Sequence, residues 1–330
     1  MITLNSGTYP DFFALDSRIR RVDLGIQWRA GNWPSTVAND ARIHHRLNRL
    51  LVAIRPQVVI SMMTETNVRT LLAVVGTHLP VIVCERIDPA KAALSAGWTA
   101  LRRWTYPLAD RVVVQTQTAS DFFRPNLARR LSVIANPIPP PDDACHGEAF
   151  AVPPCSVVAA GRFTAQKGFD VLIKAFARIA GQHPLWHLVI VGDGELRNAM
   201  EVLSADLGVR SRVLMPGRVR GLGAVLRQAE VFVLSSRFEG FPNVLCEAMA
   251  CGRAVVSTDC PSGPRDIIRD GLNGLLVPPE DVEALSAAMD RLMSHAGLRA
   301  DLGSKAKEVV EQFTPARIMA QWENLVTDLL

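Results

Sequence analysis

Short apolar runs alternate with amphipathic segments along most of the chain. Runs rich in apolar and β-branched residues predict buried strands, and apolar residues at helical spacing between them predict helices. The predicted strands cover residues 1–4, 57–62, 81–84, 111–115, 131–134, 156–161, 188–192, 213–215, 230–236, 254–258 and 275–277, with a further extended segment at 18–24. The predicted helices cover residues 40–55, 67–76, 90–106, a short segment capped by Thr118, 168–180, 196–207, 223–228, 243–250, 263–269, 282–294 and 315–330. The repeated strand–helix–strand order indicates parallel sheets and the α/β class, with the run at 57–62 buried on both faces.

A proline-rich stretch divides this pattern into two halves. Five prolines fall between residues 139 and 154, and such clusters are typical of linkers. We therefore predict a first Rossmann-like domain at 1–138, a linker at 139–154 and a second Rossmann-like domain at 155–312. The segment 313–330 is expected to be a closing helix that packs back on the first domain. A cleft between two such domains is a usual place for a small-molecule site.

Length and composition suit a two-domain globular protein. The chain has 330 residues, of which 48% are apolar, so it can bury a sizeable core. Its apolar runs are far shorter than the roughly 18 residues of a membrane helix, and no signal-peptide pattern follows Met1. The six cysteines form no CxxC pair, which favours reduced, structural thiols in a cytoplasmic protein.

Charge is spread unevenly between the halves. Residues 1–150 hold 17 Lys and Arg against 12 Asp and Glu, whereas residues 151–330 hold 19 against 20. The first half is therefore the better candidate for an anionic partner such as a phosphate, a diphosphate or an anionic membrane face, with a solvated basic surface as the alternative. The excess is small and no recognition motif is present, so a nucleic-acid partner is not expected.

The main candidate site lies where the strand at 230–236 meets the next helix. Glu239 follows the strand and Glu247 lies about one turn into the helix, so both carboxylates can face the crevice at the carboxyl edge of the sheet. The backbone N–H groups of Gly240, Phe241 and Asn243 are expected to be free to bind a hydroxyl or phosphate oxygen. A helix cap with a buried ion pair is the alternative interpretation.

Two cations follow another strand of the same sheet. Arg162 and Lys167 stand five positions apart in the turn at 161–168. A diphosphate requires fixed positive charge, which Arg supplies by gripping two oxygens and Lys as a point charge. A solvated surface loop is the alternative. The turns at 192–195 and 262–266 also open helices after strands, but each is a weak signal alone.

Together these residues resemble the retaining GT-B glycosyltransferases of family 4. The resemblance rests on Arg162 and Lys167, on the Gly-Asp-Gly turn at 192–194, and on E-G-F-P-N-V-L-C-E from Glu239 to Glu247. In the first half, the segments 84–89, 109–116 and 134–138 resemble a narrower subgroup, which adds amino sugars such as N-acetylgalactosamine to undecaprenyl-diphosphate-linked glycans. The resemblance implies the GT-B fold, with two Rossmann-like domains and a cleft between them.

The resemblance also implies a UDP- or GDP-sugar donor on the second half. Arg162 and Lys167 would hold the diphosphate and offset the charge on the leaving group, Glu247 would accept hydrogen bonds from the ribose, and Glu239 would contact the donor sugar. The implied catalytic residues are Glu239, Arg162, Lys167 and Glu85. The implied donor-binding residues are Gly161, Arg162, Lys167, Gly192, Asp193, Arg218, Glu239, Gly240, Phe241, Pro242, Asn243, Val244 and Glu247. No metal or other cofactor is implied, and the expected reaction moves a hexose or N-acetylhexosamine with retention to a lipid-diphosphate-linked or polysaccharide acceptor.

Two features depart from the family pattern. Many relatives carry a His where Glu85 and Arg86 stand; Glu85 is expected to orient an acceptor hydroxyl and Arg86 a phosphate, with a local ion pair as the alternative. The family's opening strand, glycine-rich loop and helix have no counterpart before Met1, and residues 1–4 match its second strand. We expect the truncated first domain to leave this chain less stable or less active than a form extended upstream.

One predicted helix carries both basic and aromatic side chains. Trp98, Arg102, Arg103, Trp104 and Tyr106 lie close together, which suits a lipid diphosphate or the inner face of the cytoplasmic membrane. Aromatic core with a solvated face is the alternative.

Two competing functions also remain. One is a sugar-nucleotide epimerase, which the spacing of Glu239 and Glu247 disfavours. The other is a non-catalytic sugar-nucleotide binder or an inactive fragment.

Overall fold

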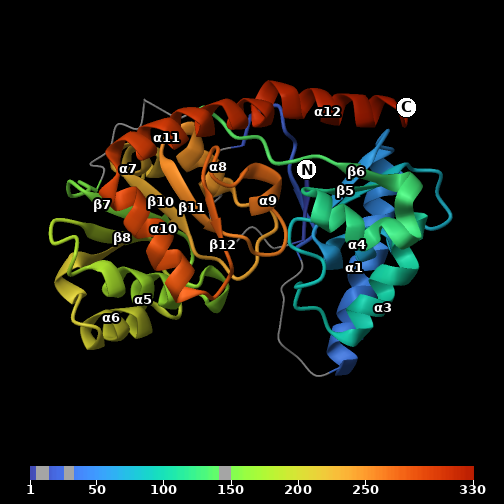
Figure 1. Cartoon of the computed structure of the whole chain (residues 1–330). Coiled ribbons are helices and arrows are strands. Elements are labelled where there is room, and N and C mark those ends of the chain that lie inside the picture. The colour runs from blue at the N-terminus through green and yellow to red at the C-terminus, as the bar shows by residue number, and fades with distance from the viewer. Residues whose placement is uncertain (5–14, 26–32, 141–149) are drawn as a thin grey trace.

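The computed structural model describes residues 1–4, 15–25, 33–140 and 150–330, which fold into two α/β halves (Figure 1). The first half contains β1 (Ile2–Thr3), β2 (Val22–Asp23), α1 (Trp33–Ile54), β3 (Val59–Met62), α2 (Thr64–Ala73), β4 (Val81–Cys84), α3 (Ala96–Thr105), β5 (Arg111–Val114), α4 (Gln117–Leu127) and β6 (Leu131–Val133). The second half contains β7 (Ser156–Ala160), α5 (Phe169–Ile179), β8 (His187–Val191), α6 (Arg197–Asp206), β9 (Val213–Gly217), α7 (Leu222–Gln228), β10 (Val231–Leu234), α8 (Asn243–Ala250), β11 (Ala254–Thr258), α9 (Pro264–Ile267), β12 (Leu275–Val277), α10 (Val282–Ser294), α11 (Ala296–Val310) and α12 (Pro315–Thr327). Short 3₁₀ turns lie at 106–108, 128–130, 165–167, 210–212 and 311–313.

Every strand pairing in the described residues is parallel. The second half has a six-stranded sheet in the order β12-β11-β10-β7-β8-β9, and the first half has a four-stranded sheet in the order β3-β4-β5-β6. β1 and β2 form a separate two-stranded sheet. Parallel strands place all their carboxyl ends at one edge, so the loops that follow β7, β8, β10 and β11 gather there. The predicted α/β class is confirmed.

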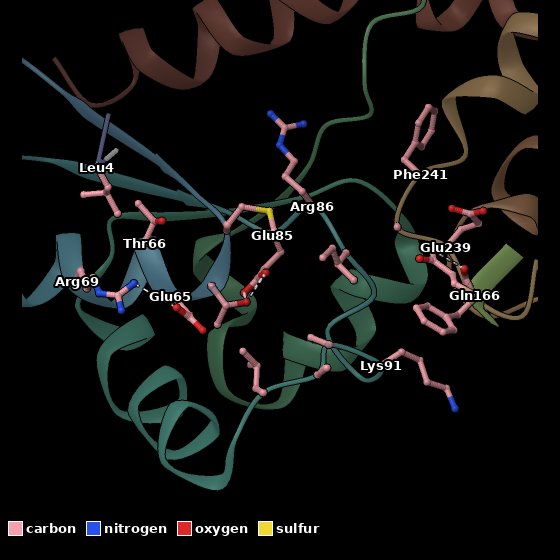
Figure 2. Close-up of a pocket in the computed structure, with 18 of the residues that line it drawn as sticks. Leu4, Glu65, Thr66, Arg69, Glu85, Arg86, Lys91, Gln166, Glu239 and Phe241 are labelled. Atoms are coloured by element: carbon pink, nitrogen blue, oxygen red, sulfur yellow. Dashed lines mark hydrogen bonds and ion pairs between the residues drawn. The ribbon is translucent and has the colours of Figure 1, made fainter. Parts of the chain in front are cut away.

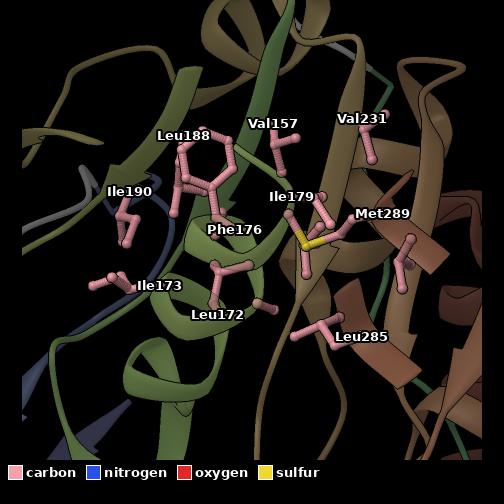
Figure 3. Packing of buried hydrophobic residues seen from close by; sticks show 14 of the residues in the cluster. Val157, Leu172, Ile173, Phe176, Ile179, Leu188, Ile190, Val231, Leu285 and Met289 are labelled. Atoms are coloured by element: carbon pink, nitrogen blue, oxygen red, sulfur yellow. The ribbon is translucent and has the colours of Figure 1, made fainter. Parts of the chain in front are cut away.

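The second sheet is covered on both faces. Apolar side chains of α5 and α10 pack against β7, β8 and β10 on one face (Figure 3). Phe176 of α5 is fully buried there, and burial of such a side chain stabilises the fold by about 1.5–3 kcal/mol. The other face packs against α7, α8 and α11. Strands buried on both faces read as continuous apolar runs, which is why the sequence located them.

The first sheet is covered unevenly. One face, including Val83 and Val112, packs on α1–α4. On the opposite face Ile82 and Cys84 are buried, but Ile60 of β3 remains 45% exposed. The prediction that residues 57–62 form a strand buried on both faces is therefore wrong: β3 is an edge strand of the described sheet, with alternate side chains open to solvent.

Four other sequence predictions need correction. The helix at 90–106 begins only at Ala96, because Asp88 accepts the Lys91 and Ala92 N–H groups in a turn and Ser95 caps the helix. α4 is capped by Thr116, not Thr118. α1 starts seven residues before the predicted position 40. Finally, α11 was not predicted, and it follows α10 directly at His295.

The chain crosses between the halves at two places that touch. The Ile138 N–H donates a hydrogen bond to the Phe313 carbonyl oxygen at 2.8 Å. Beyond this point α12 runs along both halves toward β5 and β6 (Figure 1). Its buried Ile318 and Leu325 belong to the apolar cluster that also contains Val113 and Ile134 of the first half.

Candidate active site

A cavity of about 900 Å³ lies between the two halves (Figure 2). The first half contributes Glu85, Arg86 and the N-terminal turn of α2, and the second half contributes the loop from Phe238 to Phe241. Its lining residues are Ile2, Thr3, Leu4, Arg21, Met63, Thr64, Glu65, Thr66, Arg69, Glu85, Arg86, Ile87, Lys91, Ala92, Ala93, Leu94, Gln166, Phe238, Glu239, Gly240 and Phe241. Carboxylates from both halves, Glu85 and Glu239, therefore border one cavity.

Glu239 is held in a fixed position at the carboxyl edge of the second sheet. It is 5% exposed, and its Oε1 accepts hydrogen bonds from Lys167 Nζ at 2.7 Å and from Ser236 Oγ at 2.6 Å. A buried carboxylate requires such partners to remain charged. Within the described residues, no hydrogen bond reaches its Oε2, so this atom is available to a ligand hydroxyl. Lys167 and Glu239, predicted from separate motifs, are in direct contact.

The turn that carries Lys167 is braced by Arg237. The Arg237 guanidinium binds both carboxylate oxygens of Asp170 at 3.0 and 2.9 Å, the Ala165 carbonyl at 2.7 Å and Glu280 at 2.9 Å. These partners raise the pKa of Arg237 further above its ordinary value, the Asp170 hydrogen bond being the largest cause. Because the guanidinium fork joins the turn to α5, it fixes the backbone on which Lys167 stands. Sequence reasoning missed this residue.

Gly168 allows this turn to lie close to β10. Its φ is +60°, and a Cβ there would overlap the Ser235 carbonyl oxygen. Ser235 Oγ in turn donates to the Lys167 carbonyl at 2.8 Å. The side-chain stem of Lys167 lies over Gly161, and the Phe163 N–H donates to Asp193 O at 3.0 Å. The loops after β7, β8 and β10 thus form one connected group.

Other predicted donor residues lie outside the cavity lining. The side chains of Arg162 and Arg218 are exposed, as is Asn243, whereas Pro242 is buried and Val244 half-buried. The Asn243 N–H donates to Phe241 O at 2.9 Å, so the prediction that this amide is free is wrong; the irregular turn before α8 uses it. Gly192 and Asp193 lie in the loop after β8, where the Gly192 N–H donates to Gly217 O.

Glu247 is a half-buried carboxylate in α8. Burial raises its pKa above the ordinary value, and no side-chain hydrogen bond to it occurs within the described residues. An acceptor that is desolvated but unpaired favours a ligand that brings hydroxyl donors. Glu247 and Glu239 do not contact each other through any hydrogen bond of the described chain.

Glu85 sits in a polar network on the first-half side of the cavity. It is 4% exposed, and its carboxylate accepts hydrogen bonds from Thr64 Oγ1, at 3.0 and 2.9 Å, and from the Tyr106 hydroxyl. Tyr106 also accepts from Asn67 Nδ2 at 3.0 Å. Burial raises the pKa of Glu85, while these hydrogen bonds and the charge of Arg102 act in the opposite direction. The alternative of an ion pair with Arg86 does not hold, because Arg86 binds elsewhere.

Arg86 connects the halves. Its guanidinium donates to Asn136 Oδ1 at 2.6 Å, and Asn136 Nδ2 donates to Asn243 Oδ1 at 2.8 Å. Gly240 approaches the Arg86 carbonyl so closely that a Cβ would overlap it. These contacts hold the first-half and second-half walls of the cavity side by side.

A second group of contacts ties α4 to the loop after β11. Thr116 Oγ1 and Ser262 Oγ are 2.7 Å apart. The Gln117 N–H donates to Asp266 Oδ2 at 3.0 Å, so a carboxylate of one half accepts from the N-terminus of a helix in the other. Burial raises the pKa of Asp266. No pattern in the sequence indicates these pairings.

The proposed membrane residues separate into two groups. Arg102 is 6% exposed and donates to Pro89 O at 3.1 Å, so the prediction that it faces a bilayer is wrong. Trp104 is 78% exposed, and Arg103 is exposed as well. Trp98 is partly buried beside Arg69, and Tyr106 belongs to the core.

Metal clusters and membrane-spanning helices are both absent from the described ranges. No three His, Cys, Asp or Glu side chains lie close enough there to hold a metal ion. Among the described helices none has the length and apolar character needed to cross a membrane. The five cysteines that the structure describes are free thiols, four of them buried.

Several curated proteins are similar in sequence to this chain. The chain is 26% identical over 96% of its length, and 87% of the relative's, to an α-1,4-N-acetyl-D-galactosaminyltransferase of Campylobacter jejuni named for a GalNAc-containing undecaprenol-diphosphate glycan. It is 32% identical over 90% of its length to an exopolysaccharide phosphotransferase of Streptomyces coelicolor, but spans only 31% of that protein. Many of the curated relatives are matched over less than two thirds of their own length.

A solved structure and a family model are also similar to this chain. The structure of Anabaena HepE with UDP and glucose superposes with a TM-score of 0.78 at 18% identity, covering 94% of this chain and 86% of that one. Residues 150–309 match the model of the family "Glycosyl transferases group 1". The matched family and the relatives' names support a transferase enzyme. The chain has the GT-B fold, and its residues 150–309 are similar to the glycosyl transferases group 1 family.

Proposed function

We propose that this chain is a retaining family 4 glycosyltransferase, which moves a hexose or N-acetylhexosamine from a nucleotide-diphosphate donor to a lipid-diphosphate-linked or polysaccharide acceptor. The observation that carries the proposal is the ion pair of Lys167 with Glu239, a carboxylate at the border of a cavity that Glu85 borders from the other half. A cation beside a sugar-binding carboxylate, facing a second carboxylate, suits transfer between two sugars.

The donor would lie on the second half. Lys167 and the exposed Arg162 would receive the diphosphate, and the unpaired Glu247 would accept hydrogen bonds from the ribose hydroxyls. Backbone beside Arg218 would meet the base. UDP is supported by the nucleotide bound in HepE; GDP is the other candidate. The scheme uses no metal and no cofactor.

The acceptor would enter from the first half. Glu85, fixed by Thr64 and Tyr106, would orient the acceptor hydroxyl, and Arg86 would lie near an acceptor phosphate. The name of the Campylobacter relative supports a lipid-linked glycan and an amino sugar. Such an acceptor is held in a membrane, so we place the protein at the inner face of the cytoplasmic membrane, with Arg103 and Trp104 toward an anionic surface.

In the proposed reaction the bond from the sugar anomeric carbon to the diphosphate oxygen breaks, and a bond from that carbon to the acceptor oxygen forms on the same face. The acceptor proton passes to an oxygen of the departing phosphate. Negative charge grows on the diphosphate as this bond breaks, and the fixed positive charge of Lys167 stabilises it most at that stage.

Donor screening followed by product analysis tests the proposal. UDP- and GDP-sugars are tested for protection against thermal unfolding, and those that protect are incubated with a lipid-linked acceptor; products are identified by mass spectrometry and by the configuration of the new linkage. We expect a retained linkage. Protection without transfer to any acceptor would instead identify a non-catalytic binder, and a changed sugar without acceptor would identify an epimerase.

A further inference from the structure

A second cavity lies wholly in the first half and is lined mainly by residues of α3 and α4. Its volume is about 660 Å³, within the range of small-molecule sites. It is lined by Leu94, Ala96, Thr99, Ala100, Arg102, Arg103, Trp104, Tyr106, Phe122, Phe123, Asn126 and Leu127. We call it the α3–α4 groove.

Eight of the twelve residues that line the groove are apolar or aromatic. Phe122 is 43% exposed and meets the buried Phe123 edge-on, with ring centroids 5.0 Å apart. The Arg102 guanidinium lies 5.1 Å from the Phe122 ring and 5.5 Å from the Phe123 ring, so its charge is covered by aromatic faces. Thr99 and Asn126 offer the few uncharged polar groups. An extended ligand without hydrogen-bonding groups suits such walls better than a peptide backbone, which must satisfy its N–H and C=O groups.

The groove adjoins the cavity between the two halves. Leu94 lines both. Tyr106 lines the groove, while its hydroxyl donates to Glu85 at the border of the larger cavity. A ligand with a polar head beside Glu85 can therefore continue past Leu94 with an apolar tail in the groove.

The outer rim of the groove is apolar and cationic. Leu101, Trp104 and Leu108 are all exposed, and their spacing places them on one side of α3 and the turn that follows it. Arg103 is exposed beside them. Exposed Trp with a neighbouring cation is typical of a surface that meets lipid headgroups.

We propose that the α3–α4 groove binds the isoprenoid chain of a diphosphate-linked acceptor and so selects acceptors by their hydrocarbon part. The proposal rests on the proposed function, because it assumes that the acceptor is lipid-linked. It adds a site for the chain, distinct from the residues that face the reacting sugars.

The probe is geranylgeranyl diphosphate that carries a photoreactive group at the end of its chain. Ala100 and Thr99 are exposed residues that line the groove, so Ala100→Trp and Thr99→Phe fill it without changing the core. Ala300→Trp, on the exposed surface of α11, is the matched control. We expect cross-links to α3 and α4 peptides in the unmodified chain and the control, and about tenfold weaker probe binding in both filled variants, equivalent to about 1.4 kcal/mol.

Kinetics with two acceptors separate the groove from the reaction. Ala100→Trp should raise the KM of a lipid-linked acceptor about tenfold and leave kcat unchanged, whereas a chain-free sugar acceptor should react equally with both proteins. Equal probe binding by all variants, or competition by inorganic diphosphate as strong as by geranylgeranyl diphosphate, would overturn the proposal. Failure of the unmodified chain to transfer to either acceptor would instead count against the proposed function, since probe binding does not depend on transfer.

Discussion

The two sheets of the molecule differ in how they are covered. The six-stranded sheet lies between helices on both faces, and its edge loops are tied together by Lys167, Glu239 and Arg237. The four-stranded sheet has α1–α4 packed on one face, while α12 covers the other face only in part and leaves Ile60 largely exposed. A braced framework suits a diphosphate, which requires charges at fixed places. The more open half suits acceptors that differ in shape.

The largest effect should come from Lys167→Ala. Removing this fixed cation from the second half should lower the transfer rate about 10²–10³-fold. The rate is measured as kcat with saturating donor. Lys174→Ala, an exposed residue of α5, is the control. The change also leaves Glu239 buried without its partner, so Lys167→Ala with Glu239→Gln should recover thermal stability but not rate. A rate within threefold of the unmodified chain would contradict the role of Lys167.

Arg237→Ala should have the next largest effect. Loss of the bonds to Asp170 and Ala165 frees the turn that carries Lys167, and we expect kcat to fall about 10–100-fold, since small misplacements of a catalytic group cost this much. Arg237→Lys should recover only part of the lost kcat, because Lys lacks the guanidinium fork. Arg265→Ala, an exposed partner of Asp259, is the control. A fall in thermal stability with unchanged kcat would show that Arg237 is structural only.

Glu247→Gln should weaken donor binding while stabilising the empty protein. The loss of charge-assisted hydrogen bonds to the ribose should raise the donor Kd about tenfold or more. The folded-state pKa of Glu247 is raised, so its ionised form costs stability as pH rises above the ordinary carboxyl value. The Gln variant should therefore melt higher than the unmodified chain at pH 8, and the difference should shrink toward pH 4. A lower melting point at pH 8 would contradict this account.

Tyr106→Phe tests the more open half. It leaves Glu85 with Thr64 as its hydrogen-bond partner, which should cost about 1–2 kcal/mol in the free energy of unfolding. The acceptor KM should rise about fivefold, equivalent to about 1 kcal/mol, while donor protection stays unchanged. Urea unfolding measures the free energy of unfolding, and acceptor titrations measure the KM. An equal loss of donor binding would mean that donor and acceptor binding are not divided between the two halves.

The smallest effect should come from Ile60→Thr. Ile60 is exposed on β3, so the substitution should change the free energy of unfolding by less than about 0.5 kcal/mol. The matched change Ile190→Thr lies in β8, where the side chain is fully buried, and should cost about 2 kcal/mol or more. Similar costs at both positions would mean that the face of the first sheet is covered in solution.

Local patterns predicted the strand–turn–helix around Glu239 well. The apolar run before it and the Pro-Asn start of α8 are properties of a few neighbouring residues, so the sequence is enough to locate them. Sheet topology predicted that the loops of Lys167 and Glu239 leave the same edge, whereas a buried ion pair was expected only in the alternative interpretation of the carboxylates. α11 was not predicted, because its apolar residues form no clear stripe at helical spacing.

Contacts between distant segments could not be predicted in this way. Whether Arg102 points outward depends on the rotation of α3, which its bond to Pro89 and its contact with Phe122 decide. Thr116 and Ser262 meet only because the halves are docked. Arg237 is part of the sequence run that carries Glu239, yet its bond to Asp170 depends on how α5 packs.

The bond between Ile138 and Phe313 has a mechanical consequence. The two places where the chain passes between the halves are fastened to each other, so they act as one pivot rather than two independent tethers. A body held at one pivot turns with little strain near the pivot and with growing displacement farther away. Relative rotation of the halves would thus leave the backbone beside Phe313 nearly still and change mainly the separation of Arg86 from Gly240, at the wall of the cavity.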